Sequence, residues 1–350
     1  MVYLTLWAMK LDFEKIEALK ELLSQPKKVV ILSHTNPDGD AIGSSLALAE
    51  VLKAHGHTVH CILPNRFPYY LKWMPCSDEL IIHALDKIGI AQSVIEAAEV
   101  VICADMSSLS RLEALTEIIA TNTTAKRVLI DHHLNPSSEF DLIFSSPESS
   151  STAYLVYEIL KAAYGTEVFN QTIATLLYVG MITDTGNFAF STINAELFRA
   201  AADLLETGID VPTIYNNVYN SFTEGRARLF GYVINRKMKT ILKGTVAYLS
   251  LTEDEMRRYW FQQGDSEGFV NYPLSIKKVK MSAMFSEQQG GFIRVSLRSH
   301  GKVDVNTFAR RYFNGGGHHN AAGGKSFMNM EDTIAHYIAA VEEYHNEGLV

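Results

Sequence analysis

The chain has 350 residues, 47% of them apolar and 20% charged, which is an ordinary composition for a soluble globular protein. A chain of this length is longer than the chains that usually fold around a single hydrophobic core, so two domains are expected. Three separated cysteines exclude a disulfide framework or a thiolate zinc site. The first residues lack a basic segment, and no apolar run approaches the roughly 20 residues of a membrane span, so we expect a cytoplasmic protein. The sequence leaves open whether Met1 or Met9 is the true start.

The formal net charge of −8 is unevenly distributed. Residues 226–325 carry 17 Lys and Arg against 7 Asp and Glu, whereas the rest of the chain carries 14 against 32. Such asymmetry indicates that the later part of the chain binds an anion. A merely solvated basic face would explain the charge equally well.

The first half alternates short apolar runs with helical patterns. Runs without polar alternation indicate strands buried on both faces, as in a parallel sheet covered by helices. We therefore expect an α/β, doubly wound, mainly parallel domain over residues 1–203. Its strands are predicted at 29–32, 58–63, 100–103 and 127–130, and its helices at 44–52, 151–164 and 171–182.

The pattern changes after this first domain. Residues 204–224 are helix-like and less apolar, with Gly208 and Pro212 as breaks, and are interpreted as a helical linker. Residues 225–350 are interpreted as a smaller α+β domain. Its strands are predicted at 245–251, 279–285 and 292–297, and a helix at 330–347.

The densest group of polar residues follows the first predicted strand, where His34, Asp38 and Asp40 fall within seven residues. Ligands of open α/β sheets bind beyond the carboxyl ends of the strands. Pro37 and Gly39 favour a tight loop that turns the three side chains toward one point. The helix N-terminus, expected near residues 42–44, would offer backbone N–H groups to an anion. A polar turn with a capping aspartate would explain one of these carboxylates but not the whole group.

Further acidic and histidine residues lie at the ends of later predicted strands and helices. Asp105 follows the third strand, and the Asp-His-His segment at 131–133 follows the fourth. Asp184 follows the helix predicted at 171–182. Parallel strands would bring these side chains to one sheet edge. Divalent cations would compensate so many carboxylates. Oxygen-rich ligation with some imidazole favours Mn²⁺, with Mg²⁺, Co²⁺ or Fe²⁺ as alternatives. Six such groups suit two metal ions about 3.5–4 Å apart, as in many phosphatases and nucleases.

The order of these motifs resembles the four-motif signature of DHH-family phosphoesterases. The matching residues are His34-x-Asn36-Pro37-Asp38-x-Asp40 with Gly43-Ser44, then Asp105, Asp131-His132-His133 and Asp184. The resemblance implies that His34 and Asp38 hold one metal and that Asp40, His132 and Asp184 hold the other. It also implies that Asp105 bridges the metals, and that His133 binds the substrate phosphate or protonates the leaving oxygen.

A second motif lies in the predicted C-terminal domain. Consecutive glycines can align backbone N–H groups into an anion nest, although a flexible turn would also use them. Residues 315–324 resemble the GGGHxxAAG motif of the DHH-associated C-terminal domain, and Arg298 stands at that domain's usual arginine position. Arginine grips phosphate in a bidentate manner. The predicted substrate-binding residues are Arg298, Gly315, Gly316, Gly317 and His318, and Phe188 or Phe313 is a candidate to stack on a base.

Within the family, the chain resembles the stand-alone NrnA-type members, which act on short oligoribonucleotides (nanoRNA) and 3′-phosphoadenosine 5′-phosphate (pAp). The second motif disfavours a pyrophosphatase. The expected partners are short single-stranded RNA or small nucleotides, without a membrane, and a homodimer is left open. Hydrolysis of cyclic di-AMP or linear pApA is the alternative function. A catalytically inactive nucleotide-binding protein is a remote alternative function, because inactive homologues usually lack a metal ligand, whereas this chain has all six candidate ligand residues and His133.

Overall fold

The computed structural model describes residues 12–189, 193–288 and 290–350. The chain forms two compact units, Met1–Ser221 and Phe222–Val350. The predicted domain limits at 203 and 225 stay a prediction, and Met9 lies outside the described residues. Among the described residues, no helix combines the length and apolar character needed to cross a membrane.

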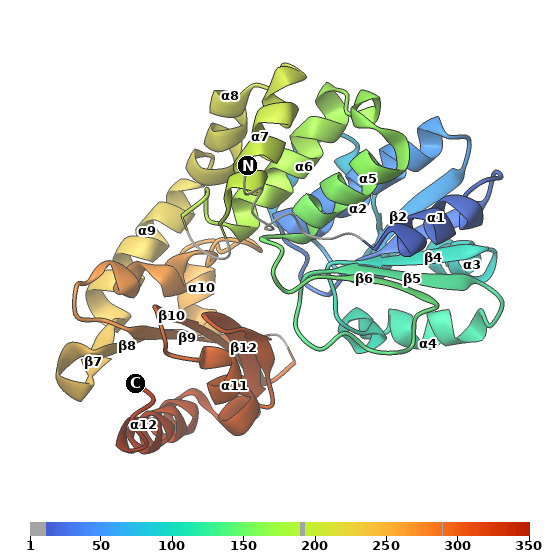
Figure 1. Cartoon of the computed structure of the whole chain (residues 1–350). Helices are drawn as coiled ribbons and strands as arrows, with labels where there is room; N and C mark the ends of the chain where they lie inside the picture. Colours follow the sequence, from blue (N-terminus) through green and yellow to red (C-terminus); the bar gives the residue numbers. More distant parts are fainter. Residues whose placement is uncertain (1–11, 190–192, 289) are drawn as a thin grey trace. The chain divides into compact units, whose positions relative to one another are not determined.

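The first unit contains a six-stranded parallel sheet, so the predicted doubly wound α/β fold is confirmed (Figure 1). The strand order is β3-β2-β1-β4-β5-β6. β1 pairs with β2 on one side and with β4 on the other, so the direction of winding reverses between β1 and β4. Ligand sites of such folds lie at this reversal. The strands are β1 (Lys28–Leu32), β2 (Thr58–Leu63), β3 (Ile81–Ile82), β4 (Val100–Ala104), β5 (Lys126–Asp131) and β6 (Leu142–Ser145).

Helices cover both faces of this sheet. Figure 1 shows α2 (Gly39–Ala54), α5 (Thr152–Tyr164) and α6 (Gln171–Asp184) on one face, and α3 (Ile90–Glu96) and α4 (Leu115–Thr121) on the other. Strand residues such as Val101 and Cys103 pack with Ile95 of α3 and Ile119 of α4 in one buried cluster. The other α-helices among the described residues of this unit are α1 (Phe13–Leu22), α7 (Ala195–Glu206) and α8 (Val211–Tyr215).

Helix α2 begins earlier than the sequence predicted. Asp38 is its N-cap, and the Ile42 N–H donates to the Asp38 carbonyl oxygen at 3.2 Å. The N–H groups of residues 42–44 therefore lie inside the helix, and the predicted anion site there is wrong. Gly43 has a packing role instead, because a Cβ at this position would overlap the Leu176 carbonyl oxygen and lie 3.1 Å from the Gly180 nitrogen of α6. The two helix backbones cross in close contact.

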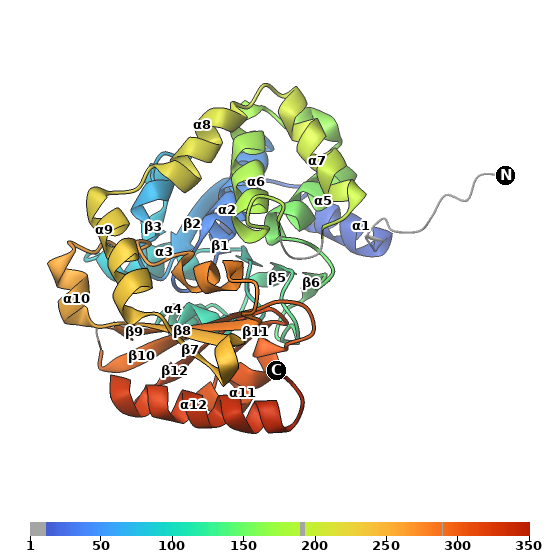
Figure 2. The same ribbon diagram turned by 90° about the vertical axis from the view of Figure 1, so that its left-hand side faces the viewer.

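The second unit contains a mixed sheet in the order β11-β12-β10-β9-β8-β7. β8 and β9 are parallel and the other pairs are antiparallel. Figure 2 shows α12 (Met330–Asn346) along the lower face of this sheet. The strands are β7 (Lys239–Ile241), β8 (Val246–Leu251), β9 (Met281–Gln288), β10 (Phe292–Ser299), β11 (Gly316–His318) and β12 (Ala321–Ser326), and the other helices are α9 (Glu224–Tyr232), α10 (Glu253–Arg258) and α11 (Val305–Phe313).

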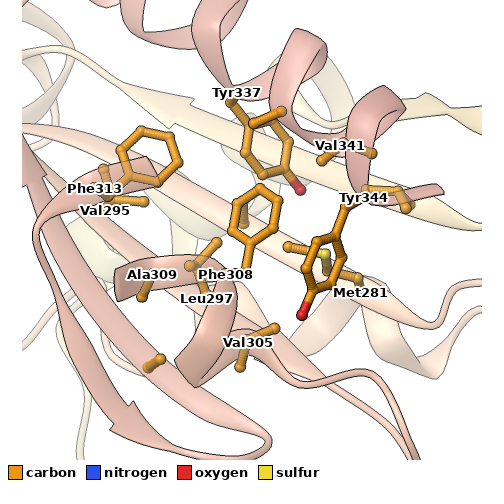
Figure 3. Packing of buried hydrophobic residues seen from close by; sticks show 14 of the residues in the cluster. Met281, Val295, Leu297, Val305, Phe308, Ala309, Phe313, Tyr337, Val341 and Tyr344 are labelled. Atoms are coloured by element: carbon orange, nitrogen blue, oxygen red, sulfur yellow. The ribbon is translucent and has the colours of Figure 1, made fainter. Parts of the chain in front are cut away.

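An aromatic cluster fills the space between this sheet and its helices α11 and α12. Figure 3 shows Phe308 among Tyr337, Tyr344 and the strand residues, and its ring lies 5.2 Å from that of Tyr344. Phe313 belongs to the same core and is only 1% exposed. The hypothesis that Phe313 stacks on a base is therefore wrong, because its ring is already enclosed by protein.

Candidate metal centre and substrate face

The fold places the predicted metal ligands beside one another at the carboxyl edge of the first sheet. His34 follows β1, and Asp38 and Asp40 stand at the start of α2. Asp105 follows β4 directly, and His132 follows β5. Asp184 ends α6. Asp105 has a positive φ of 62°, an uncommon conformation for a residue other than glycine. Aspartate adopts this conformation more readily than most residues do, and here it turns the chain at the end of β4.

The ligand atoms form two groups. In the first, single donor atoms of His34, Asp38 and Asp105 lie within 4.8 Å of one another, with His34 Nε2 3.3 Å from Asp105 Oδ2. In the second, donor atoms of Asp40, His132 and Asp184 satisfy the same limit. His132 Nε2 lies 3.4 Å from Asp184 Oδ2 and 3.7 Å from Asp105 Oδ1. Asp105 thus contacts a histidine of each group with its two oxygens, as a bridging carboxylate would.

Both histidines present the nitrogen that a metal requires. His34 Nδ1 lies 2.9 Å from the Thr35 carbonyl oxygen, and His132 Nδ1 lies 3.3 Å from the Ser149 carbonyl oxygen. A carbonyl oxygen only accepts, so each Nδ1 carries the hydrogen. Each Nε2 therefore faces the carboxylates, where it can donate a hydrogen to them or, without that hydrogen, offer its lone pair to a cation, as metal-binding histidines do. The donor set therefore fits divalent cations.

Helix α5 orients two of the carboxylates. The backbone N–H groups of Thr152 and Ala153 donate to the two oxygens of Asp40 at 2.7 and 2.8 Å. The Thr152 hydroxyl donates to Asp105 Oδ1 at 2.9 Å. Helix N-termini stabilise negative charge in this way. The sequence predicted a helix at 151–164, but Thr152 as a partner of the candidate ligands was missed.

The buried carboxylates perturb one another's protonation. Burial, followed by the charges of Asp105 and Asp184, raises the pKa of Asp40 well above its usual value. Burial also raises the pKa of Asp184 to about 6, although the neighbouring His132 opposes the change. Burial would likewise raise the pKa of Asp105, but the hydrogen bond to His34 and the adjacent histidines outweigh it and lower this pKa. Such a cluster needs protons or cations to balance its charge.

His133 has a different partner from the other two histidines. Its Nδ1 donates to Oδ1 of the fully buried Asp131 at 2.6 Å. Burial alone would lower the pKa of His133, but this hydrogen bond and the charges of Asp105 and Asp131 raise it to about 9. A histidine held protonated by a buried carboxylate can donate a proton from Nε2. The sequence placed Asp131 in a motif without giving it a separate role.

In the second unit, Arg298 and His318 share one face of the sheet. Ala321 on β12 pairs with Arg298 of β10 on one side and with His318 of β11 on the other. Directly paired residues point to the same face, so the two basic side chains flank the small Ala321. Both residues are half-buried. The register thus brings these two predicted substrate-binding side chains onto a common surface.

The glycines before His318 form a strand rather than an open nest. The Gly315 N–H donates to the Ala309 carbonyl oxygen at 3.1 Å, and the Gly317 N–H donates to Asn306 Oδ1 at 3.0 Å. These two donors are therefore engaged within the protein, and the expected nest of aligned free N–H groups is not formed by them. Gly317, with φ of 145°, lies so close to β12 that a Cβ would stand 2.5 Å from the Ala321 carbonyl oxygen. Binding of substrate by Gly315, Gly316 and Gly317 stays a prediction.

The fold and the site define an α/β protein with a candidate two-cation centre at a sheet edge and a basic strand face in a second unit. Residues 28–181 match the DHH family, N-terminal domain, and residues 243–347 match the DHHA1 domain. The chain belongs to the DHH family, as the order of its motifs indicated.

Two known relatives differ in what their names record. The chain is 27% identical to the bifunctional oligoribonuclease and PAP phosphatase NrnA of Thermus thermophilus, over 95% of this chain and 94% of that protein. It is 26% identical to the cyclic-di-AMP phosphodiesterase GdpP of Bacillus subtilis, over 95% of this chain but only 50% of that protein. The chain therefore spans nearly the whole of the first relative and about half of the second.

Solved structures resemble the whole chain. An exopolyphosphatase-related protein from Bacteroides fragilis matches with a TM-score of 0.89 and 38% identity, over 96% of this chain and 98% of that one. RecJ from Thermus thermophilus, solved in complex with Mn²⁺, matches with a TM-score of 0.56 and 16% identity, over 96% of this chain and 54% of RecJ. The likeness to RecJ shows the fold alone.

Proposed function

We propose that this chain is a two-metal phosphoesterase that hydrolyses short oligoribonucleotides and pAp, with Mn²⁺ as its metal. The observation that carries the proposal is a pair of neighbouring groups of candidate ligands. One group contains His34 and Asp38, and the other contains Asp40, His132 and Asp184. Asp105 contacts a histidine of each group. The named activity of the NrnA relative, which this chain matches over nearly its full length, supports the choice of substrate.

In this proposal each side chain has a defined task. His34, Asp38, Asp40, Asp105, His132 and Asp184 would hold the cations. Bound divalent cations supply positive charge to the phosphoryl oxygens and lower the pKa of the attacking water. His133, kept protonated by Asp131, donates its Nε2 proton to the leaving oxygen. Arg298 and His318 bind phosphate on the sheet face of the second unit.

Hydrolysis of cyclic di-AMP or of linear pApA is the second candidate, favoured by the likeness to GdpP. That relative is about twice as long as the part this chain matches, whereas the NrnA relative is matched almost end to end. Short oligonucleotides are therefore the preferred substrates. One substrate panel separates the two candidates: a cyclic di-AMP kcat/KM well above those of RNA dimers and pAp would favour the second.

The test uses the full chain with Mn²⁺ and measures kcat/KM for pAp, for 5′-labelled RNA dimers to pentamers and for cyclic di-AMP. Asp105→Asn keeps the side-chain shape but removes the bridging charge, so activity should fall by at least about 10²-fold. Asp78→Asn, at an exposed position of the same unit, is the matched control and should behave as the wild type. Full activity in Asp105→Asn would refute the two-metal scheme. A wild-type protein that binds nucleotides but hydrolyses none would indicate the inactive alternative.

A further inference from the structure

One face of the second sheet carries basic side chains beyond Arg298. Residues alternate along β10, so Phe292, Arg294, Ser296 and Arg298 point to one side, and Ile293, Val295 and Leu297 point into the core. Arg294 pairs with Lys325 of β12, and both side chains are exposed. Helix α9 and residues 269–275 pack over the part of this face formed by β8 and β9. The part formed by β10 and β12 carries Arg294, Arg298 and Lys325, which together we call the basic strip.

Arg294 and Lys325 are like charges placed directly opposite each other on neighbouring strands. Two such charges on paired residues repel each other, and together they raise the positive potential of the surface around them. The residues of β9 that point to the same face are uncharged: Ser282, Met284, Ser286 and Gln288. A surface of raised positive potential favours a negatively charged ligand.

The basic strip also lies beside two aromatic rings, and small residues separate its basic side chains. Lys325 Nζ lies 5.0 Å from the centre of the Phe292 ring, whose own centre lies 6.4 Å from that of the exposed Phe327. Between Arg294 and Arg298, the surface of the sheet is formed by Ser296 and its partner Gly323, which have small side chains or none. Basic groups beside aromatic rings are the combination with which proteins bind single-stranded nucleic acid.

The length of the basic strip exceeds one nucleotide. Arg298 and Arg294 are four residues apart on β10, which corresponds to about 14 Å at a rise of about 3.4 Å per residue. Phe292 lies two residues further along the strand. This span is about four times the ~3.4 Å rise per nucleotide of a stacked strand. A single-stranded chain held at Arg298 would therefore reach Arg294 with its following phosphates.

We propose that Arg294 and Lys325 bind the phosphates of the later nucleotides of a short single-stranded RNA, with Phe292 stacking on a base. The inference rests on the proposed function for its ligand class and adds a determinant of substrate length. A single nucleotide held at Arg298 is too short to reach Arg294 as well, because the two positions are about 14 Å apart along β10. Affinity should therefore increase from dimer to pentamer because of these residues.

The experiment measures binding of 5′-fluorescent RNA dimers and pentamers to the full chain in EDTA, so that no hydrolysis occurs. Arg294→Ala/Lys325→Ala should reduce the ratio of pentamer to dimer affinity by about tenfold or more. It should also lower the slope of log affinity against log salt by about 1.4, because each phosphate contact contributes about 0.7 for a single strand. Lys239→Ala/Lys243→Ala, exposed on and beside β7 at the opposite edge of the sheet, removes the same charge and should change neither quantity.

A second pair of variants separates stacking from charge. Phe292→Leu should weaken pentamer binding about 5-fold or more, and Phe292→Tyr should keep it. An unchanged length dependence in Arg294→Ala/Lys325→Ala, or an equal loss in the β7 control, would overturn the inference. Equal competition by a polyglutamate peptide would overturn it as well, since the basic strip would then be a general anion surface. RNA hydrolysis with an unaltered length dependence refutes this inference alone, whereas length-dependent binding without any hydrolysis refutes the proposed function alone.

Discussion

Replacing Thr152 by valine tests how the start of α5 supports the metal centre. The Thr152 side chain is fully buried, and its hydroxyl donates to Asp105 Oδ1 at 2.9 Å. Valine has nearly the same shape, so no cavity forms, and the backbone N–H that donates to Asp40 is kept. The variant removes one hydrogen bond from the carboxylate that contacts both candidate ligand groups.

The expected size of the effect follows from that hydrogen bond. A hydrogen bond to a charged group contributes about 1.5–3 kcal/mol. With about 1.4 kcal/mol for each factor of ten, its loss corresponds to roughly 10- to 100-fold weaker binding of Mn²⁺, the range seen when a partner of a metal ligand is removed. The measurement is isothermal titration of metal-free protein with Mn²⁺, with circular dichroism to check that the variant is folded.

Thr152→Ser is the matched control, because serine keeps the hydroxyl and loses only a methyl group. We expect serine to retain most of the metal affinity. Wild-type affinity in Thr152→Val would refute the proposed support of Asp105. An equally large loss in both variants would show that packing of the methyl group, and not the hydrogen bond, maintains the site.

Three further predictions follow from the geometry of the first unit. Gly43→Ala forces a Cβ into the α6 backbone and should lower the free energy of unfolding in urea by about 1–3 kcal/mol, whereas Gly231→Ala in α9, where a Cβ meets nothing, should be neutral or stabilising. Asp131→Asn removes the charge that raises the pKa of His133 to about 9, so the alkaline limb of kcat/KM should move to lower pH; an unmoved limb would argue against His133 as the acid. Because Asp184, with a pKa raised to about 6, must lose its proton to bind a cation, the affinity for Mn²⁺ should fall as pH drops below about 6, and equal affinities at pH 5 and 7.5 would contradict this.

The sequence predicted the parts of the fold whose residues carry a strong pattern. Runs such as 29–32 and 100–103 are apolar without interruption, and both are central strands ending beside His34 and Asp105. The placement of the six candidate ligand residues at or near strand and helix ends therefore follows from the amino-acid pattern. Strands β3 and β6 were missed because they are short and lie at the sheet edges, where little burial is needed.

Other features depend on tertiary contacts that the sequence does not encode locally. Strand β12 consists largely of alanine and glycine, which have low strand propensity, and it forms because β10 and β11 pair with it on both sides. The hydrogen bond from Thr152 to Asp105 joins residues 47 positions apart. Likewise, the face shared by Arg294 and Lys325 follows from the register of β10 and β12 and not from either segment alone.

The ligands of the candidate centre are contributed between residues 34 and 184, so nearly all of the first sheet must be assembled before they meet. Cations that bind only this assembled state would also protect the chain from proteolysis, since a ligand present at 100 times its Kd stabilises the folded state by about 2.7 kcal/mol. A cell short of the metal would then lose the protein as well as its activity, because unfolded chains are degraded faster. The abundance of this protein would in that way follow the supply of divalent metal without any dedicated regulator.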